Sequence, residues 1–107
     1  MRTVPYPTPG EILLEEFLKP LAISQSRLAK EIGVPPRKIG EIIVGKHDIT
    51  AEIDLRMSCY FGLSEGFWTG LQDDYNRAVA KEKLHDVLLQ IKPIQQQQDF
   101  ALPIQEF

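Results

Sequence analysis

The sequence of 107 residues predicts an all-α fold of five helices. Apolar side chains recur at helical spacing, and serine, threonine, glycine or proline residues stand where helices would begin and end. The segment from Ser24 to Lys46 also has a small residue, Ala29, where two helices would cross, and Gly33 for a tight turn. This combination is typical of a helix-turn-helix unit, which places a short second helix in the major groove of DNA.

The first helix is predicted from about Glu11 to Leu18. Glu11 complements the positive end of the helix dipole, and Pro20 is expected to stop the helix because its ring clashes with the preceding turn. The side that faces the core would consist of Leu13, Leu14, Phe17 and Leu21.

The two helices of the helix-turn-helix unit are predicted over Gln25–Ile32 and about Pro36–Val44. Ser24 can cap the first helix, and Gly33 suits the left-handed conformation that commonly ends one. Two prolines open the second helix without loss, because the first amides of a helix have no internal partner. The side chains expected to face the core are Leu28, Ala29, Ile32, Ile39, Ile42 and Ile43.

Two more helices complete the predicted domain. The fourth covers about Ala51–Phe61, with Thr50 as its cap and Gly62 at its end, and Ser64 is expected to cap the fifth. Their apolar faces would be formed by Ile53, Met57, Tyr60 or Phe61, and then Phe67, Trp68, Leu71 and Tyr75.

The apolar pattern changes phase beyond Ala78, and a new stripe follows three charged residues. We interpret this as a kink or a separate helix, whose apolar side chains either form a dimer contact or pack back onto the domain. An extended piece near Ile94 is the alternative candidate for the dimer contact. Beyond Pro93, the glutamine-rich tail is expected to be poorly ordered, or ordered only by a partner. We therefore divide the chain into a DNA-binding domain, residues 8–78, and a C-terminal helix with a flexible tail, residues 79–107. The stripe consists of Leu84, Val87, Leu88 and Ile91.

The charge of the chain is unevenly distributed. The formal net charge is −3, yet the segment 24–46 has five lysine or arginine residues and only two glutamates, a local charge of +3. Acidic residues are concentrated in the segment 48–76, which we expect to face away from DNA. A specific DNA-binding protein needs only a local basic surface, so an acidic chain can still bind phosphates.

Several other classes of protein are disfavoured. Cys59 is the single cysteine, which excludes an intrachain disulfide, and its apolar neighbours indicate an inert thiol on a packed helix. His47 and His85 lie far apart without ligand-like neighbours, so neither a metal nor a cofactor is expected. No membrane-spanning run, signal peptide or catalytic constellation is apparent, and we expect a cytoplasmic protein that is not an enzyme.

Residues from about Thr8 to Tyr75 resemble the HigA/VapI antitoxins, within the phage-repressor-like (XRE) helix-turn-helix family. The leading Pro-Gly-Glu-Ile-Leu of residues 9–13 and the trailing Phe-Trp, Leu-Gln and Tyr of residues 67–75 narrow the resemblance to this branch. The other matching pieces are Ser-Gln at 24–25, Leu-Ala at 28–29, Gly-Val at 33–34, Ile at 39 with Glu-Ile-Ile at 41–43, Gly-Lys at 45–46, Ile-Thr-Ala at 49–51, Leu-Arg-Met-Ser at 55–58 and Tyr-Phe-Gly at 60–62.

The resemblance implies a five-helix, phage-repressor-like domain in a homodimer that represses its own operon by binding operator DNA in the promoter. It also implies a type II toxin-antitoxin module, in which the protein binds a small, basic, RNA-cleaving toxin. Phe67, Trp68 and Tyr75 could form a surface for this toxin, although we favour core packing for them. The main alternative is a stand-alone XRE-type transcriptional regulator of the same fold, without a toxin.

Base contacts are expected from the start of the second helix of the unit, at Pro36, Arg37 and Glu41. Arg37 can donate to both acceptors of a guanine, and Pro36 can touch a thymine methyl group. Glu41 either accepts from a cytosine amino group or holds Arg37 through an i, i+4 pair. Contacts to phosphate are expected from Gln25, whose role rests on the resemblance, and from Arg27, Lys38, Lys46 and His47.

Overall fold

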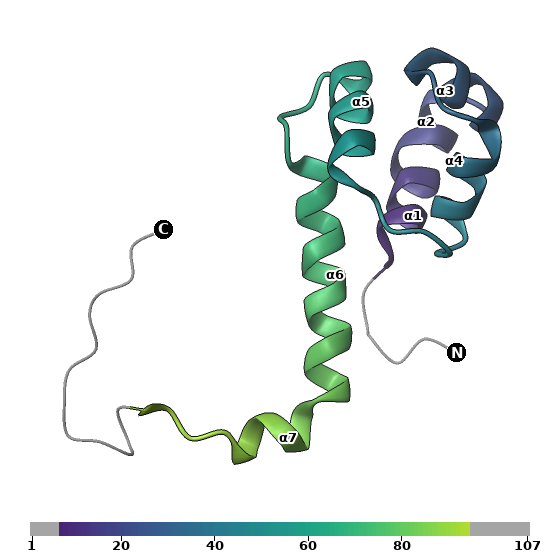
Figure 1. Ribbon diagram of the computed structural model, residues 1–107. Helices are drawn as coiled ribbons and strands as arrows, with labels where there is room; N and C mark the ends of the chain where they lie inside the picture. Colours follow the sequence, from purple (N-terminus) through teal and green to yellow (C-terminus); the bar gives the residue numbers. More distant parts are fainter. Residues whose placement is uncertain (1–6, 95–107) are drawn as a thin grey trace.

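The computed structural model describes residues 7–94, which contain helices and no strand (Figure 1). Three consecutive elements form the continuous first helix, and the next four helices complete a small helical body from which the last helix departs. The elements are α1 (Pro9–Ile12), η1 (Leu13–Leu18), α2 (Lys19–Leu21), α3 (Gln25–Ile32), α4 (Pro36–Ile43), α5 (Ala51–Phe61), α6 (Phe67–Lys83) and α7 (His85–Gln90). The all-α prediction is confirmed, and none of the helices described is long and apolar enough to cross a membrane.

The first helix differs from its prediction at both ends. It begins at Pro9, where Thr8 and Glu11 form a capping box: the Thr8 hydroxyl accepts from the Glu11 amide, and Glu11 accepts from the Thr8 amide. It continues through Pro20 and ends at Ala22, which has a left-handed φ of 56°. The expectation that Pro20 stops this helix was therefore wrong.

A π-helical turn explains how the helix continues to Pro20. In η1 each amide reaches back five residues, and the Lys19 amide donates to the Leu14 carbonyl. The wider turn brings Leu13 and Leu18 onto the same side, where both are buried. A regular α-helix would point two residues five apart in directions roughly 140° from each other. Leu21, predicted to face the core, is instead 54% exposed.

The core lies between the first helix and the four that follow it. Every residue predicted to face inward from α3 is buried, and Ile39 and Ile42 of α4 are buried as well. Trp68 of α6 is fully buried and packs against Phe17 and Phe61, with ring centroids 4.8 Å and 6.0 Å away. Core packing is thus confirmed for Trp68, whereas Phe67 remains 38% exposed.

Helix α6 begins with a cap that lies far away in the sequence. The buried Asp54 carboxylate of α5 accepts hydrogen bonds from the amides of Gly66 (2.7 Å), Trp68 (2.7 Å) and Thr69 (3.1 Å). Ser64 was predicted to supply this cap, but only its carbonyl takes part, accepting from the Phe67 amide. The prediction was wrong because α6 starts three residues after Ser64, with Gly66 in the N-cap position.

The C-terminal part of the described chain projects away from the body (Figure 1). Helix α6 runs across the predicted domain boundary at residue 78 as far as Lys83, and the chain bends at Leu84 into α7. The predicted stripe lies around α7, with exposures of 40% for Leu84, 54% for Val87, 45% for Leu88 and 62% for Ile91. These side chains therefore do not pack back onto the domain. The predicted flexible tail, from residue 95 onward, lies outside the described residues.

Candidate nucleic-acid interface

Helices α3 and α4 are joined by a turn that the local sequence explains well. The Ser24 hydroxyl caps α3 by accepting from the Arg27 amide at 3.0 Å. Gly33 ends the helix with a φ of 75°, and the amides of Gly33 and Val34 both donate to the Ala29 carbonyl at 2.9 Å. The fully buried Ala29 methyl group then lets α4 cross closely over α3. The result is the predicted helix-turn-helix arrangement.

Helix α4 presents its polar side to solvent. Its N-cap, Pro35, makes no side-chain hydrogen bond to the first turn, and Pro36 and Arg37 are exposed. The Arg37 side chain is 87% exposed and points away from the core that Ile39 and Ile42 enter. The start of α4 is thus free to approach another molecule.

Glu41 lies between two of the predicted contact residues on this surface, Arg37 and His47. Its Oε2 accepts a hydrogen bond from Arg37 Nε at 3.1 Å, one helical turn away. Its Oε1 lies 3.1 Å from His47 Nε2, in the loop that follows α4. Among the two roles predicted for Glu41, the structure displays the i, i+4 pair with Arg37.

The other residues predicted to contact phosphate lie on α3, on α4 and in the loop after α4. Gln25 lies over α4, because its Oε1 would be 3.6 Å from a Cβ placed on Gly40. Arg27, Lys38 and Lys46 form no ion pair with any residue in the range 7–94. Arg27 and Lys46 are exposed, whereas Lys38 is half-buried.

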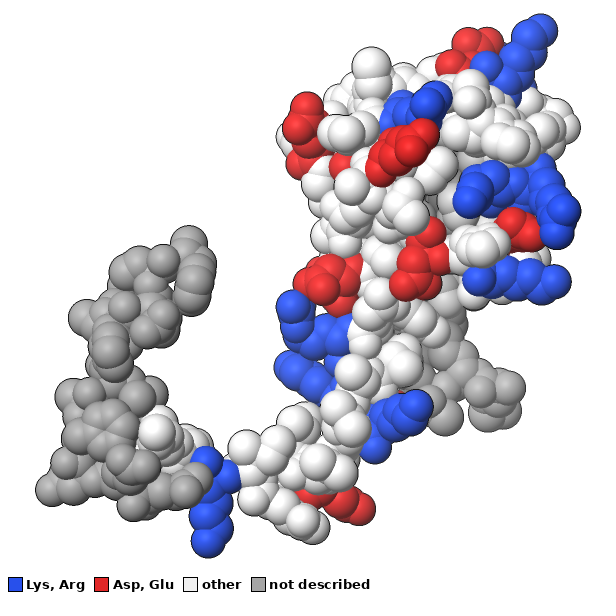
Figure 2. All heavy atoms as spheres, in the orientation of Figure 1, with Lys and Arg blue, Asp and Glu red and all other residues white. Residues whose placement is uncertain are grey.

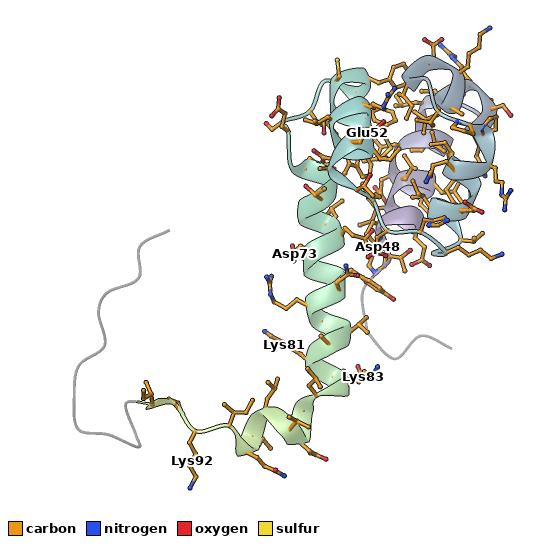
Figure 3. The ribbon with its side chains drawn as sticks, in the orientation of Figure 1. Asp48, Glu52, Asp73, Lys81, Lys83 and Lys92 are labelled. Atoms are coloured by element: carbon orange, nitrogen blue, oxygen red, sulfur yellow. The ribbon has the colours of Figure 1, made fainter. Side chains whose placement is uncertain are left out.

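Charge is divided between two sides of the body. Lysine and arginine side chains gather along the side formed by α3 and α4, and most acidic side chains in the same view lie over α5, α6 and the loop before α5 (Figure 2). Asp48, Glu52 and Asp73 belong to this acidic side, whereas Lys81, Lys83 and Lys92 follow the end of α6 and the projecting arm (Figure 3). A polyanion would therefore meet attraction mainly at α3 and α4.

Three supporting contacts were not predicted from the sequence. Arg56 of α5 donates from Nη1 to the Ile32 carbonyl at 2.7 Å, and thereby holds the end of α3 next to the turn. The buried Gln72 of α6 accepts from the Ile49 amide at 2.8 Å, in the loop that follows α4. Gly10 lets α1 touch the end of α4, since a Cβ there would lie 2.8 Å from Ile43 Cα.

Local sequence signals for these contacts are weak. Arg56 and Gln72 both fall within pieces that resemble the HigA/VapI pattern, but their partners lie 24 and 23 residues away.

Cys59, expected on a packed helix, is exposed. No group of three histidine, cysteine, aspartate or glutamate side chains in residues 7–94 is arranged to hold a metal ion.

A left-handed glycine turn between two short helices, with the second one cationic and exposed, defines a helix-turn-helix DNA-binding protein. A family model described as helix-turn-helix matches residues 14–68, and the chain belongs to this family, in the branch that includes the HigA and VapI proteins. The resemblance seen in the sequence is thereby confirmed.

Individual relatives agree with this assignment. Virulence-associated protein I of Dichelobacter nodosus is 42% identical over 74 residues, which span 69% of this chain and 68% of that protein. The uncharacterized HTH-type transcriptional regulator YddM of Escherichia coli is 31% identical over 81% of this chain and 90% of its own length. The structure of Pseudomonas aeruginosa antitoxin HigA with the higBA promoter has a TM-score of 0.76 and 33% identity, covering 81% of this chain and 96% of that one.

Proposed function

We propose that this chain is the antitoxin of a type II toxin-antitoxin module, and that it represses its own operon by binding operator DNA as a homodimer. The observation that carries the proposal is the exposed, cationic start of α4, a helix that packs against α1 and α3. The Pseudomonas aeruginosa protein of the same fold was solved with the higBA promoter, which favours DNA as the partner of this surface.

In the proposed complex, the first turn of α4 lies in the major groove and α3 crosses the backbone. Arg37 reads a guanine, Pro36 contacts a neighbouring base edge, and Glu41 positions Arg37. Phosphate contacts come from Gln25 and from three lysine and arginine side chains of the helix-turn-helix unit, which are Arg27, Lys38 and Lys46.

DNA binding is tested with the segment upstream of the gene. Fluorescence anisotropy at several salt concentrations should give tighter binding to one site in this segment than to a scrambled duplex of equal length. The logarithm of the affinity should fall steeply with the logarithm of the salt concentration, because each neutralised phosphate releases counterions. Equal affinity for both duplexes would refute operator recognition.

The second part of the proposal is a toxin partner. A small basic toxin would be attracted by the acidic side of α5 and α6, where Asp48, Glu52 and Asp73 lie (Figure 3). Coexpression with the adjacent small open reading frame should yield a complex that survives affinity purification of either protein. Absence of such a reading frame, or of a complex, would contradict this part alone.

The competing function is that of a stand-alone regulator. YddM, which resembles this chain over 90% of its own length, is described as a transcriptional regulator and not as an antitoxin. Both functions require operator binding, so only the toxin experiment separates them.

The homodimer is expected to form through the projecting arm, which consists of α7 and the residues that flank it. Leu84, Val87, Leu88 and Ile91 are all at least 40% exposed, and Leu89 is 73% exposed. A contiguous apolar surface of this kind is typical of a protein interface. Two copies joined there would present two α4 helices to a two-fold operator.

A further inference from the structure

The loop after α4 folds back onto Glu41. Gly45 has a φ of 82°, which turns the chain so that the amides of Lys46 and His47 both donate to the Glu41 carbonyl, at 2.8 Å and 3.3 Å. The same turn brings His47 Nε2 to 3.1 Å from the Glu41 carboxylate. His47 is therefore tied to Glu41 by its backbone as well as by its side chain.

Each oxygen of the Glu41 carboxylate lies 3.1 Å from a side-chain nitrogen. Oε1 faces His47 and Oε2 accepts from Arg37, while the Glu41 side chain is only 22% exposed. The side chains of Arg37 and His47 are 87% and 51% exposed. Glu41 is thus the least exposed member of the cluster, with one neighbouring side chain at each carboxylate oxygen.

This arrangement determines which donors of Arg37 remain available. Glu41 engages Nε, and both terminal nitrogens of the guanidinium stay free to donate. Two such donors match the O6 and N7 acceptors of a guanine in the major groove. An arginine held at Nε loses less side-chain freedom on binding than an unrestrained one.

We propose that His47 is a positioning residue for base reading: it fixes Glu41, and through Glu41 it orients Arg37 toward a guanine. This inference rests on the proposed operator binding. It differs from the phosphate contact predicted from the sequence, because a phosphate contact strengthens binding to every duplex, whereas a positioning residue changes the preference for one base pair.

Lys46 is the natural control because it precedes His47, is exposed and forms no ion pair with the described residues. Because Lys46 has no ion-pair partner that it could orient, it should contribute to the binding affinity through a direct phosphate contact. Replacement of either residue by alanine keeps both backbone hydrogen bonds to the Glu41 carbonyl, so the loop should keep its fold.

The test is a double-mutant cycle on operator binding with the variants His47→Ala, Glu41→Ala and the combination of both. For each protein, the affinity for the operator is divided by the affinity for operators with a single substituted base pair. His47→Ala should lower this ratio by about three- to tenfold at the guanine read by Arg37, which is the range expected for releasing one ordered side chain. In the Glu41→Ala background, the same change should alter the ratio by less than about twofold, because residues that act through one another are not additive.

Two further measurements separate the outcomes. The salt dependence of operator binding should be unchanged in His47→Ala, whereas Lys46→Ala should reduce the slope by about one. His47→Lys, which keeps a side-chain nitrogen donor near Glu41, should recover most of the lost preference. The inference is overturned if His47→Ala weakens all duplexes equally, lowers the salt slope and adds fully to Glu41→Ala. A wild-type protein without any sequence preference would instead refute the proposed operator binding.

Discussion

Asp54 offers the sharpest test of how α6 is joined to the rest of the helical body. Its carboxylate is 3% exposed and caps α6 by accepting from three backbone amides, at 2.7, 2.7 and 3.1 Å. Asp54→Ala removes all three acceptors at once. Asp54→Asn keeps the size of the side chain but turns one acceptor oxygen into a donor.

The cost follows from the surroundings of each amide. The hydrogen bond from Trp68 is buried, so the freed amide should cost about 1–3 kcal/mol, the penalty of an unsatisfied buried donor. The bonds from Gly66 and Thr69 are partly buried, and water can replace much of their loss. The alanine variant also avoids burying a carboxylate, which offsets part of the total. We expect a net loss of about 2–4 kcal/mol for Asp54→Ala, and about 1–2 kcal/mol for Asp54→Asn.

Urea unfolding followed by circular dichroism measures these differences directly, at one fixed protein concentration because a dimer adds its own stability. Asp73→Ala is the matched control, since Asp73 is an exposed aspartate on α6 that forms a surface ion pair with Arg77. This substitution should change the free energy of unfolding by less than about 0.5 kcal/mol. If Asp54→Ala unfolds at the same urea concentration as this control, the reasoning about the cap is wrong.

Three other substitutions test the contact between α1 and α4, the role of Arg37 and the proposed dimer contact. Gly10→Ala places a methyl group against the backbone of α4, with the Ile43 Cα only 2.8 Å away, so it should weaken operator binding at least tenfold and lower the thermal midpoint, as measured by anisotropy and calorimetry. Arg37→Ala should cost about 1–3 kcal/mol of operator binding and relax the preference at one base pair, and a gel-shift series without any loss would contradict its role. Val87→Glu combined with Leu88→Glu places charges on the exposed stripe and should convert a dimer to monomers in light scattering, while leaving the helical circular dichroism signal intact.

The sequence predicts the middle of the fold well because its signals there are local. Helices α3 and α5 begin at capping hydroxyls and end at left-handed glycines, each within one turn of the helix that it bounds. The bend near Leu84 was likewise visible as a change of apolar phase.

The first helix shows where local rules fail. Pro20 usually ends a helix because it lacks an amide and its ring crowds the previous turn. Here the π-helical turn just before it changes the bonding pattern, and burial of Leu13 and Leu18 stabilises that turn. Tertiary packing determines this outcome, and the residues between 13 and 20 contain no separate signal for it.

The candidate site likewise has one part that could be expected from the sequence and one part that could not. Arg37, Glu41 and His47 lie within eleven positions of one another, so their clustering could be expected from the sequence, and Glu41 had been assigned two alternative roles. The contacts of Asp54 and Arg56 join residues 12 to 24 positions apart, and a single sequence does not indicate which partners such residues find. The contacts that could not be predicted are therefore mainly the long-range hydrogen bonds that hold the site in place.

This support bears on how a dimer could read DNA. The proposed dimer contact lies on α7, the proposed reading surface lies on α4, and α6 connects them. Helix α6 is joined to α5 through the Asp54 cap, and Arg56 of α5 in turn binds the end of α3. Helix α6 is also joined to the loop after α4 through a chain of hydrogen bonds, in which Gln72 binds the Ile49 amide and Asn76 binds Asp48. A two-fold operator requires a fixed separation of the two reading helices, about one turn of DNA or a multiple of it. Stiff joints at both places allow a contact formed on the arm to set that separation, so their loss should impair binding to the full operator far more than binding to a half-site.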